Sequence, residues 1–325
     1  MKNKVALVYD LNDNKLRDDT YSWTYRGMWE ALQDEADEIT HINFDCDAKD
    51  IVADKIIFYD IHSSHNVTIK GIEKHPALKF EYMDDPFQID QHGIRMRSNL
   101  KYFKLGAKSR MIRAQKRGLD FIICPYLSEY NRYMSQYAEN IKLIWFPVAP
   151  NLKYFGDRFK PFKDRKSEIL ANGSVNTLQK YETFYNFRRE VFKSPLVNLY
   201  QTTANKQKRN EQMFEMEGKN YPVFLSNWKA ACALCEFPVP KYFEIPLAGC
   251  LTFIQYNFDA YLLGFRHKKN CIVIEPNNYQ AWFKSFLAAP ETFEPVAKAG
   301  QKLVENNYTA EKFAKAILGI SIERK

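Results

Sequence analysis

The sequence lacks a hydrophobic run long enough to cross a membrane. Stretches such as Phe121–Cys124 and Cys271–Ile274 are far shorter than the ~20 apolar residues that a membrane span requires. The opening Met-Lys-Asn-Lys leads directly into an apolar stretch and does not resemble a secretion signal. We therefore expect no transmembrane segment and a cytoplasmic location.

Cysteine clusters are also scarce. The six cysteines are scattered, and most lie in apolar stretches, where a reduced thiol behaves as a small buried hydrophobe. Cys232 and Cys235 have CxxC spacing, but no second pair and no His cluster nearby completes a four-ligand zinc site. We expect a buried helical segment to account for this pair.

Several nucleotide and catalytic signatures are missing as well. The sequence has no GxSxG elbow, Walker loop or GxGxxG fingerprint, which disfavours hydrolase, NTPase and dehydrogenase functions. Asp84-Asp85 precedes Pro86 and is more typical of a turn than of a ligand set, so no DxD motif is placed to hold a metal. We expect no bound metal and no cofactor.

The patterns that are present indicate two α/β domains. The chain has 325 residues and 46% hydrophobic content, which suffices for two cores. A helical pattern covers 21–32, and strand-like runs cover 5–9, 55–59, 79–82, 119–124 and 142–146 in the first half. Such alternation predicts a parallel sheet covered on both faces.

Pro147 and Pro150 interrupt this alternation and mark a linker. We predict a first domain over 1–150 and a second over 151–307. In the second domain, strand-like runs cover 168–172, 197–200, 223–225, 251–254 and 271–274, and helical patterns cover 180–192, 281–287 and 295–305. A terminal helical segment covers about 308–325.

Charge is distributed unevenly. The formal net charge is +8, and residues 91–119 contain nine basic residues and no acid: Arg95, Arg97, Lys101, Lys104, Lys108, Arg110, Arg113, Lys116 and Arg117. Interleaved aromatics, Tyr102 and Phe103, are typical of nucleic-acid surfaces, so this segment is a candidate site for a polyanionic acceptor. A solvated helix face explains the same run.

The most informative segment runs from Cys235 to Gly249 and contains Glu236 and Glu244, separated by seven residues. Pro240 suits the first turn of a helix and Gly249 its end, so a short helix is expected between them, leading into the strand at 251–254. A carboxylate can accept hydrogen bonds from the two hydroxyls of a ribose, and a helix N-terminus favours phosphate. The alternative is that both glutamates merely solvate a loop and a helix face.

This segment resembles the E-x7-E signature of retaining glycosyltransferases, and its stretch Pro240–Gly249 is similar to the CgeB-like, GT4-like (group 1) branch. The resemblance implies the GT-B fold, with two Rossmann-like α/β domains whose parallel sheets face each other across a cleft, and a last helix that packs back on the first domain. It also implies that Glu244 binds the ribose of a nucleotide sugar, a UDP-sugar in our expectation, while Glu236 lies near the donor sugar. Lys241 stands where related chains often have Arg, a bidentate donor that lysine does not replace.

Other candidates lie where strands are expected to end. Gly173 and Ser174 end a strand and could form a loop for the donor diphosphate, or an ordinary tight turn. Lys180 and Arg188 follow and could neutralise the leaving diphosphate. His62 and His65 follow another strand and could orient an acceptor hydroxyl, or have no chemical task.

The leading hypothesis is a hexosyl- or pentosyltransferase that moves a sugar from a nucleotide sugar to an acceptor hydroxyl with retention and without a metal. The acceptor could be DNA with hydroxymethylated bases or an anionic cell-surface polymer. The rival is a non-catalytic protein that binds nucleic acid or glycan on the same scaffold, with 95–117 as its working surface. The oligomeric state is left open by the sequence.

Overall fold

The computed structural model describes residues 3–9, 23–43, 46–59, 69–83, 107–156, 159–173, 182–201 and 218–321. The chain divides into two compact units. Unit 1 comprises Met1–Asn14, Trp29–Pro147 and Ala314–Lys325, and unit 2 comprises Lys15–Met28 and Val148–Phe313. Within the described ranges, no helix combines the length and apolar character needed to cross a bilayer.

Unit 1 is built on a six-stranded, fully parallel sheet with the order β2-β1-β3-β4-β5-β6. Its strands are β1 (Lys4–Val8), β2 (Glu38–Ile42), β3 (Lys55–Tyr59), β4 (Leu78–Tyr82), β5 (Phe121–Cys124) and β6 (Lys142–Trp145). Every residue of β3, β4 and β5 is buried, as expected for central strands that helices cover on both sides.

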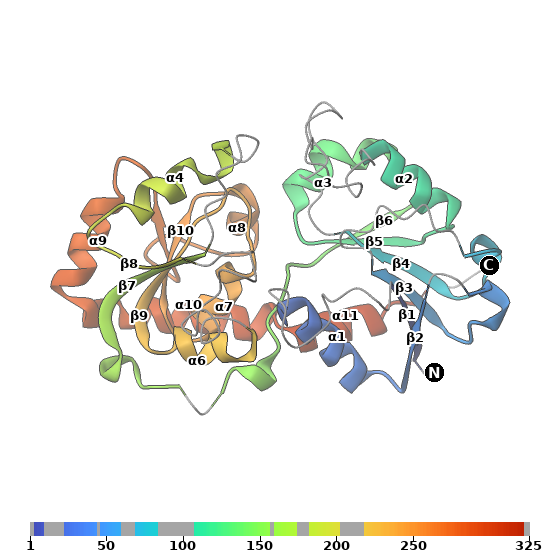
Figure 1. Ribbon diagram of the computed structural model, residues 1–325, viewed down its shortest axis with the longest axis horizontal. Helices are drawn as coiled ribbons and strands as arrows, with labels where there is room; N and C mark the ends of the chain where they lie inside the picture. The colour runs from blue at the N-terminus through green and yellow to red at the C-terminus, as the bar shows by residue number, and fades with distance from the viewer. Residues whose placement is uncertain are drawn as a thin grey trace. The chain divides into compact units, whose positions relative to one another are not determined.

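Helices cover both faces of this sheet (Figure 1). On one face lie α2 (Ala107–Lys116) and α3 (Leu127–Tyr133), and on the other lie α1 (Trp23–Glu35) and α11 (Ala310–Leu318). The indole of Trp29 packs edge-on against the rings of Tyr59 and Tyr82, with centroids 4.7 and 5.7 Å away. Lys315 of α11 forms an ion pair of 3.4 Å with Glu35 of α1.

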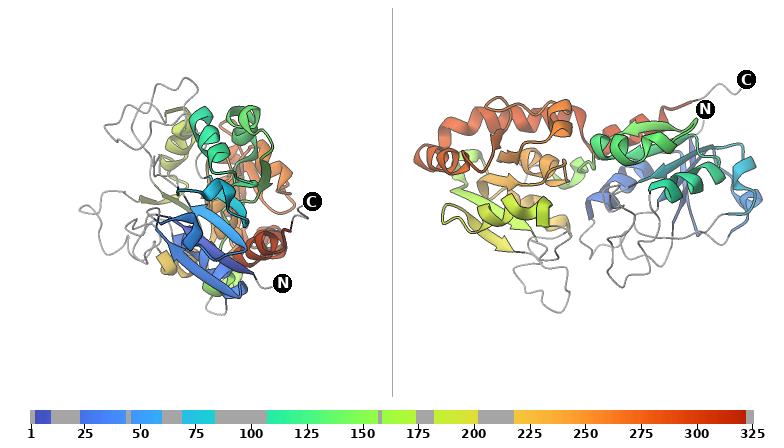
Figure 2. Two further views of the ribbon diagram at one scale, coloured as in Figure 1. Left: turned by 90° about the vertical axis from the view of Figure 1, so that its right-hand side faces the viewer. Right: turned by 90° about the horizontal axis from the view of Figure 1, so that it is seen from above.

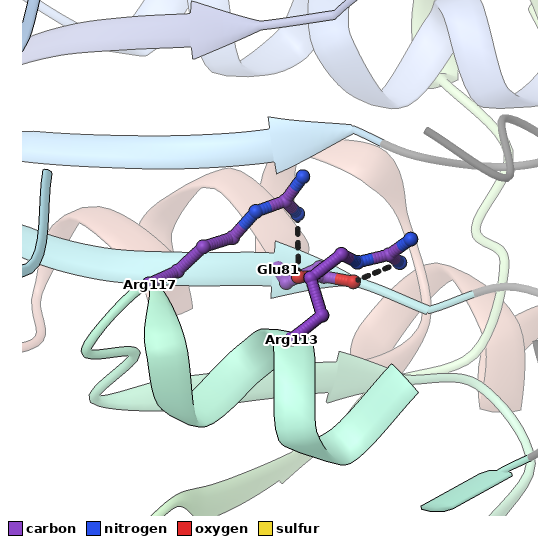
Figure 3. A network of polar contacts seen from close by, with 3 residues as sticks. All are labelled: Glu81, Arg113 and Arg117. Atoms are coloured by element: carbon purple, nitrogen blue, oxygen red, sulfur yellow. Dashed lines mark hydrogen bonds and ion pairs between the residues drawn. The ribbon is translucent and has the colours of Figure 1, made fainter. Parts of the chain in front are cut away.

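A buried charged cluster ties α2 to the sheet (Figure 3). The carboxylate of Glu81, on β4, accepts hydrogen bonds from Arg113 at 3.0 Å and from Arg117 at 2.8 Å. The three residues are 1%, 6% and 0% exposed, and the guanidinium of Arg117 also lies 4.6 Å from the ring centroid of Phe58. Although burial opposes ionisation of Glu81, the two guanidinium groups hold the pKa of that carboxyl below its usual value.

These contacts correct part of the expected polyanion surface. Arg113 and Arg117 were predicted to face an acceptor, but both guanidinium groups point into unit 1 and pair with Glu81. The reason is helical spacing. Arg117 directly follows α2, and its backbone N–H donates to the carbonyl of Arg113 at 3.0 Å, so both side chains lie on the helix face that covers the sheet. The charge run is therefore not one continuous solvated surface.

Unit 2 contains a five-stranded parallel sheet with the order β11-β10-β9-β7-β8. Its strands are β7 (Lys166–Gly173), β8 (Asn198–Gln201), β9 (Trp228–Ala233), β10 (Leu251–Gln255) and β11 (Ile272–Ile274). The helices that accompany this sheet are α4 (Glu182–Phe192), α6 (Tyr221–Leu225), α7 (Lys241–Leu247), α8 (Phe258–Leu262), α9 (Tyr279–Ala288) and α10 (Glu294–Asn307).

The sheet of unit 2 is also covered on both faces (Figures 1 and 2). A core formed by Phe187, Phe253, Phe283 and Phe286 fills the space between the sheet and the helices α4 and α9. On the opposite face, α7 and α10 pack together, and a Cβ at Gly300 would lie only 2.5 Å from the carbonyl oxygen of Asn270. The absence of a side chain at position 300 therefore allows this close packing.

Most expected elements are confirmed, and the strand at 55–59 has the predicted bounds. Two expectations are wrong. The run at 223–225 belongs to α6, a helix with Pro222 in its first turn. The CxxC pair spans the end of a strand and is not helical, since Cys232 lies inside β9 and Cys235 lies just after it. β2 and β9 were not expected from the sequence pattern.

Candidate functional site

The sheet order of unit 2 defines where a ligand is expected to bind. β8 lies on one side of β7, whereas β9, which follows β8 in the chain, lies on the other side. The strand order thus reverses between β7 and β9. In open α/β sheets, ligands bind outside the carboxyl ends of the strands at such a switch point. The candidate site therefore comprises the residues that follow Asn172 of β7 and Ala233 of β9.

The glutamate segment lies at this position. α7 begins after Pro240 and ends at Leu247, and Gly249 follows with φ = +76°, a left-handed conformation that favours glycine. This confirms the helix predicted between Pro240 and Gly249 and the strand that follows it. A Cβ at Gly249 would also lie 3.0 Å from Nη2 of Arg165, whose Nη1 donates to the carbonyl of Ala248 at 2.8 Å.

The two glutamates differ in their environment. Glu244 lies in the first turn of α7 and is 4% exposed, whereas Glu236 lies in the loop after β9 and is exposed. A buried carboxylate requires polar or charged partners, and the ammonium of Lys241 is one charged group close enough to interact with Glu244. Glu244 is thus part of a charged cluster and does not solvate a helix surface.

Lys241 reaches from α7 to the carboxyl end of β7. Its Nζ donates a hydrogen bond of 2.5 Å to the carbonyl oxygen of Asn172. The next residue, Gly173, has φ = +127°, and a Cβ there would lie 2.7 Å from Nζ of Lys241. Glycine at position 173 therefore supplies both the backbone conformation and the space that the ammonium group occupies.

The charge of Lys241 is poorly compensated. Burial, followed by the positive charge of Arg188, lowers its pKa from 10.5 to about 7, although Glu244 acts in the opposite direction. The guanidinium of Arg188, on α4, donates from Nε to the carbonyl oxygen of Leu234 at 2.8 Å, and Nη2 donates to the same oxygen. Two cations therefore meet where β7 and β9 end, which is an environment that favours a bound anion.

A hydrogen-bond network fixes the backbone around these side chains. The hydroxyl of Tyr242 lies 2.8 Å from the carbonyl oxygen of Cys235 and 2.9 Å from that of Gln255, and accepts a hydrogen bond of 3.0 Å from Asn257 Nδ2. It thereby joins the ends of β9 and β10 next to Glu236. Tyr242 and Asn257 were not among the predicted site residues, since only their positions after β9 and β10 could have indicated them.

Several predicted site residues lie outside the described residues. They are His62, His65, Ser174, Lys180, Arg95, Arg97, Lys101 and Lys104. β3, the strand before His62 and His65, ends at Tyr59, and the switch point of the unit 1 sheet lies between β1 and β3. Of the basic residues on α2, Lys116 is exposed, Arg110 is partly buried, and Lys108 lies in the first turn.

The cysteines near the site are buried thiols. All six cysteines are free, and burial raises the pKa of Cys235 to about 11 and that of Cys232 further above its usual value. Neither thiol is poised to ionise near neutral pH. In the part of the chain that the structure describes, no three His, Cys, Asp or Glu side chains converge as a set of metal ligands.

Comparison with solved structures identifies the fold. The chain resembles sucrose-phosphate synthase from Thermosynechococcus elongatus, with a TM-score of 0.65, 11% identity and coverage of 97% of both chains. It also resembles an α-glucosyltransferase in complex with UDP-glucose and DNA containing an abasic site, with a TM-score of 0.60, 10% identity and coverage of 98% of this chain and 100% of that one.

A third similar structure is Anabaena HepE in complex with UDP and glucose, with a TM-score of 0.57, 9% identity and coverage of 98% of both chains. The fold of this chain is therefore GT-B, as the sequence analysis predicted. No family model matches the sequence. No curated protein matches it either.

Proposed function

We propose that this chain is a glycosyltransferase that moves a sugar from a nucleotide sugar, preferably a UDP-sugar, to an acceptor hydroxyl. The observation that carries the proposal is the charged cluster of Lys241, Glu244 and Arg188 at the switch point of the unit 2 sheet. The fold supports it, since HepE and the α-glucosyltransferase were solved with UDP or UDP-glucose. Fold alone does not define an activity, so the proposal rests on the residues of the site.

In this proposal, each charged side chain has one task in donor binding. Glu244 accepts hydrogen bonds from the ribose hydroxyls, and Glu236 contacts hydroxyls of the donor sugar. Lys241 and Arg188 neutralise the diphosphate, with Gly173 and Ser174 beside it. Because α7 has only seven residues, we assign the positive charge at the diphosphate to these side chains and not to the helix terminus.

The transfer step follows from this arrangement. The bond between the anomeric carbon and the donor phosphate oxygen breaks, and a new bond forms from that carbon to the acceptor oxygen. The acceptor proton passes to a donor phosphate oxygen, which gives a retaining reaction that requires no metal. Lys241 and Arg188 stabilise the negative charge that develops on the leaving diphosphate. The resemblance of the Pro240–Gly249 segment supports, in this proposal, a grouping with CgeB-like, GT4-like enzymes.

The acceptor side is assigned to unit 1. We propose that His62 or His65 orients the acceptor hydroxyl. Because Arg113 and Arg117 are buried, the polyanion surface of our proposal retains Arg95, Arg97, Lys101, Lys104, Lys108, Arg110 and Lys116. The two acceptor classes of this proposal are DNA and an anionic cell-surface polymer. DNA is the acceptor to test first, because the similar α-glucosyltransferase was solved in complex with DNA.

The decisive experiment compares Glu244→Gln with Glu305→Gln, a control on an exposed position of α10. We expect Glu244→Gln to weaken binding of UDP and UDP-glucose by about 100-fold in calorimetry, because hydrogen bonds to a charged carboxylate contribute ~1.5–3 kcal/mol each. The control should bind as the wild type does, and both melting temperatures should stay within about 4 °C of the wild type.

Wild-type affinity in Glu244→Gln would contradict the role of this residue. A screen of UDP, GDP, CDP and their sugars by thermal shift identifies the donor, because a ligand selective for the native state raises its stability. If the wild type binds none of them yet binds DNA or an anionic glycan, the non-catalytic binding function replaces the transferase.

A further inference from the structure

An exposed apolar surface lies beyond β10, at the same edge of the sheet as the candidate site. The described part of the chain exposes eight large hydrophobic side chains, and four of them fall within seven consecutive residues. They are Tyr256, Phe258, Tyr261 and Leu262, which are 54%, 56%, 47% and 43% exposed. Exposed hydrophobic residues that are scattered singly need no explanation, but a contiguous group indicates an interaction surface. We call these four residues the α8 surface.

The α8 surface reverses the usual orientation of a surface helix. Phe258, Tyr261 and Leu262 are spaced i, i+3 and i+4, so they lie on one face of α8, and that face points outward. The residues that point inward are Asp259 and Ala260, which are 2% and 1% exposed. An apolar face that points outward is unfavourable in water alone.

The orientation of this helix is fixed by hydrogen bonds. Oδ1 of Asn257 accepts a hydrogen bond of 2.7 Å from the backbone N–H of Ala260, which caps the helix. Nδ2 of Asn257 donates to Tyr242 in the network described above. The exposed apolar face is therefore presented by an anchored helix.

Cations follow the α8 surface in the chain. The guanidinium of Arg266 lies 3.8 Å from the ring centroid of Tyr261 and donates to the backbone carbonyl of the same residue. Lys268 and Lys269 follow and are exposed, and the ammonium of Lys268 lies 4.9 Å from the ring centroid of Trp282 on α9. Between 256 and 269 the only acidic residue is Asp259, which is buried. The exposed part of this segment therefore combines apolar and positively charged groups with no negative charge.

We propose that the α8 surface binds the surface of an anionic phospholipid bilayer. Aromatic and aliphatic side chains enter the boundary between headgroups and acyl chains, and neighbouring Lys and Arg pair with anionic headgroups. This chemistry matches the exposed side chains of Phe258 and Leu262, the contact of Arg266 with Tyr261, and the exposed Lys268 and Lys269 that follow in the chain. The proposal is independent of the transferase activity.

Two other occupants fit less well. A single-stranded nucleic acid would stack its bases on open aromatic faces, but Leu262 has no ring and Arg266 already covers one face of Tyr261. A second copy of the chain would use the same patch on both partners of a two-fold dimer, which would bring the cations at 266–269 toward their own copies. An anionic bilayer satisfies the apolar and the charged groups together.

The test measures co-sedimentation of the full chain with vesicles of phosphatidylcholine, alone or mixed with phosphatidylglycerol. We expect the wild type to bind the mixed vesicles and to release them as salt rises, because the charge contribution is screened. Phe258→Ser/Leu262→Ser should bind at least about tenfold more weakly. The matched control, Leu199→Ser/Val223→Ser, removes two side chains that are 41% and 38% exposed in the same unit and should bind as the wild type does.

A third variant, Lys268→Glu/Lys269→Glu, should lose the preference for phosphatidylglycerol. Circular dichroism melting of each variant checks that it folds. Equal vesicle binding by Phe258→Ser/Leu262→Ser and the wild type would overturn the proposal, as would a wild type that does not bind the mixed vesicles. If the wild type does not bind the mixed vesicles, two further measurements identify the occupant. An oligonucleotide complex that Phe258→Ser/Leu262→Ser loses would assign the surface to a polyanion, and a dimer that this variant loses would assign it to a second copy.

Discussion

Two charged clusters in this protein remove ionic groups from water with different results. In unit 1, Glu81 is paired with both Arg113 and Arg117, and the pKa of its carboxyl stays below the usual value despite complete burial (Figure 3). In unit 2, the ammonium of Lys241 lies near Glu244, yet burial and Arg188 bring its pKa down to about 7. The first cluster compensates the buried charge, and the second does not.

This difference separates a structural role from a functional one. A buried ion pair with satisfied hydrogen bonds fixes one element against another, as the Glu81 cluster fixes α2 against β4. A cationic group whose pKa is strongly shifted, at a switch point of an α/β sheet, is instead a candidate ligand site. An anion that binds beside Lys241 would supply the missing compensation.

The largest effect is expected from Glu81→Gln. Removing the carboxylate leaves two buried guanidinium groups uncompensated, so the free energy of unfolding should fall by about 3–5 kcal/mol. Urea unfolding followed by circular dichroism measures the change. The control, Glu38→Gln, breaks an exposed ion pair of 3.0 Å with Lys4 and should cost at most about 1 kcal/mol. If Glu81→Gln lowers the free energy of unfolding as little as the control does, the Glu81 cluster does not stabilise the fold.

Lys241→Met should have opposite effects on stability and on binding. Because the substitution removes a charge that is costly to bury, the free energy of unfolding should rise by ~1 kcal/mol. UDP-glucose binding should weaken by about 100-fold, since the diphosphate loses a cation. Lys284→Met, on an exposed position of α9, should change neither. A less stable variant with intact affinity would show that Lys241 is structural.

The smallest effect is a pH dependence with opposite signs for stability and affinity. Between pH 7 and 10.5 the folded chain binds fewer protons at Lys241 than the unfolded chain, so the destabilising contribution is complete below pH 7 and is relieved as pH rises. If the bound diphosphate requires the ammonium form, affinity should fall by up to about tenfold per pH unit above 7.

Calorimetry with UDP-glucose at several pH values tests this slope, because its diphosphate does not titrate in this range. Lys241→Met should remove the pH dependence of both stability and affinity in this range. Any pH dependence that remains in this variant comes from other groups that titrate. A wild-type affinity that stays constant from pH 7 to 9 would show that the protonation state of Lys241 does not affect donor binding.

The sequence predicted those elements whose local pattern and tertiary environment agree. The apolar run at 55–59 became β3, and Pro240 and Gly249 delimited α7, since the chemistry of each residue acts locally. β9 was missed because Ala230, Ala231 and Ala233 carry little strand preference, and only burial between β7 and β10 makes this segment a strand.

The order of residues alone specifies the α/β alternation, the spacing of Glu236 and Glu244, and the concentration of positive charge at 91–119. The tertiary structure alone decided the environment of each charge. It buried Arg113 and Arg117 against Glu81 and brought Lys241 to the carbonyl oxygen of Asn172, 69 positions earlier in the chain. The physical reason is that desolvation and Coulomb interactions depend on distances in space, which residue spacing does not specify across separate elements.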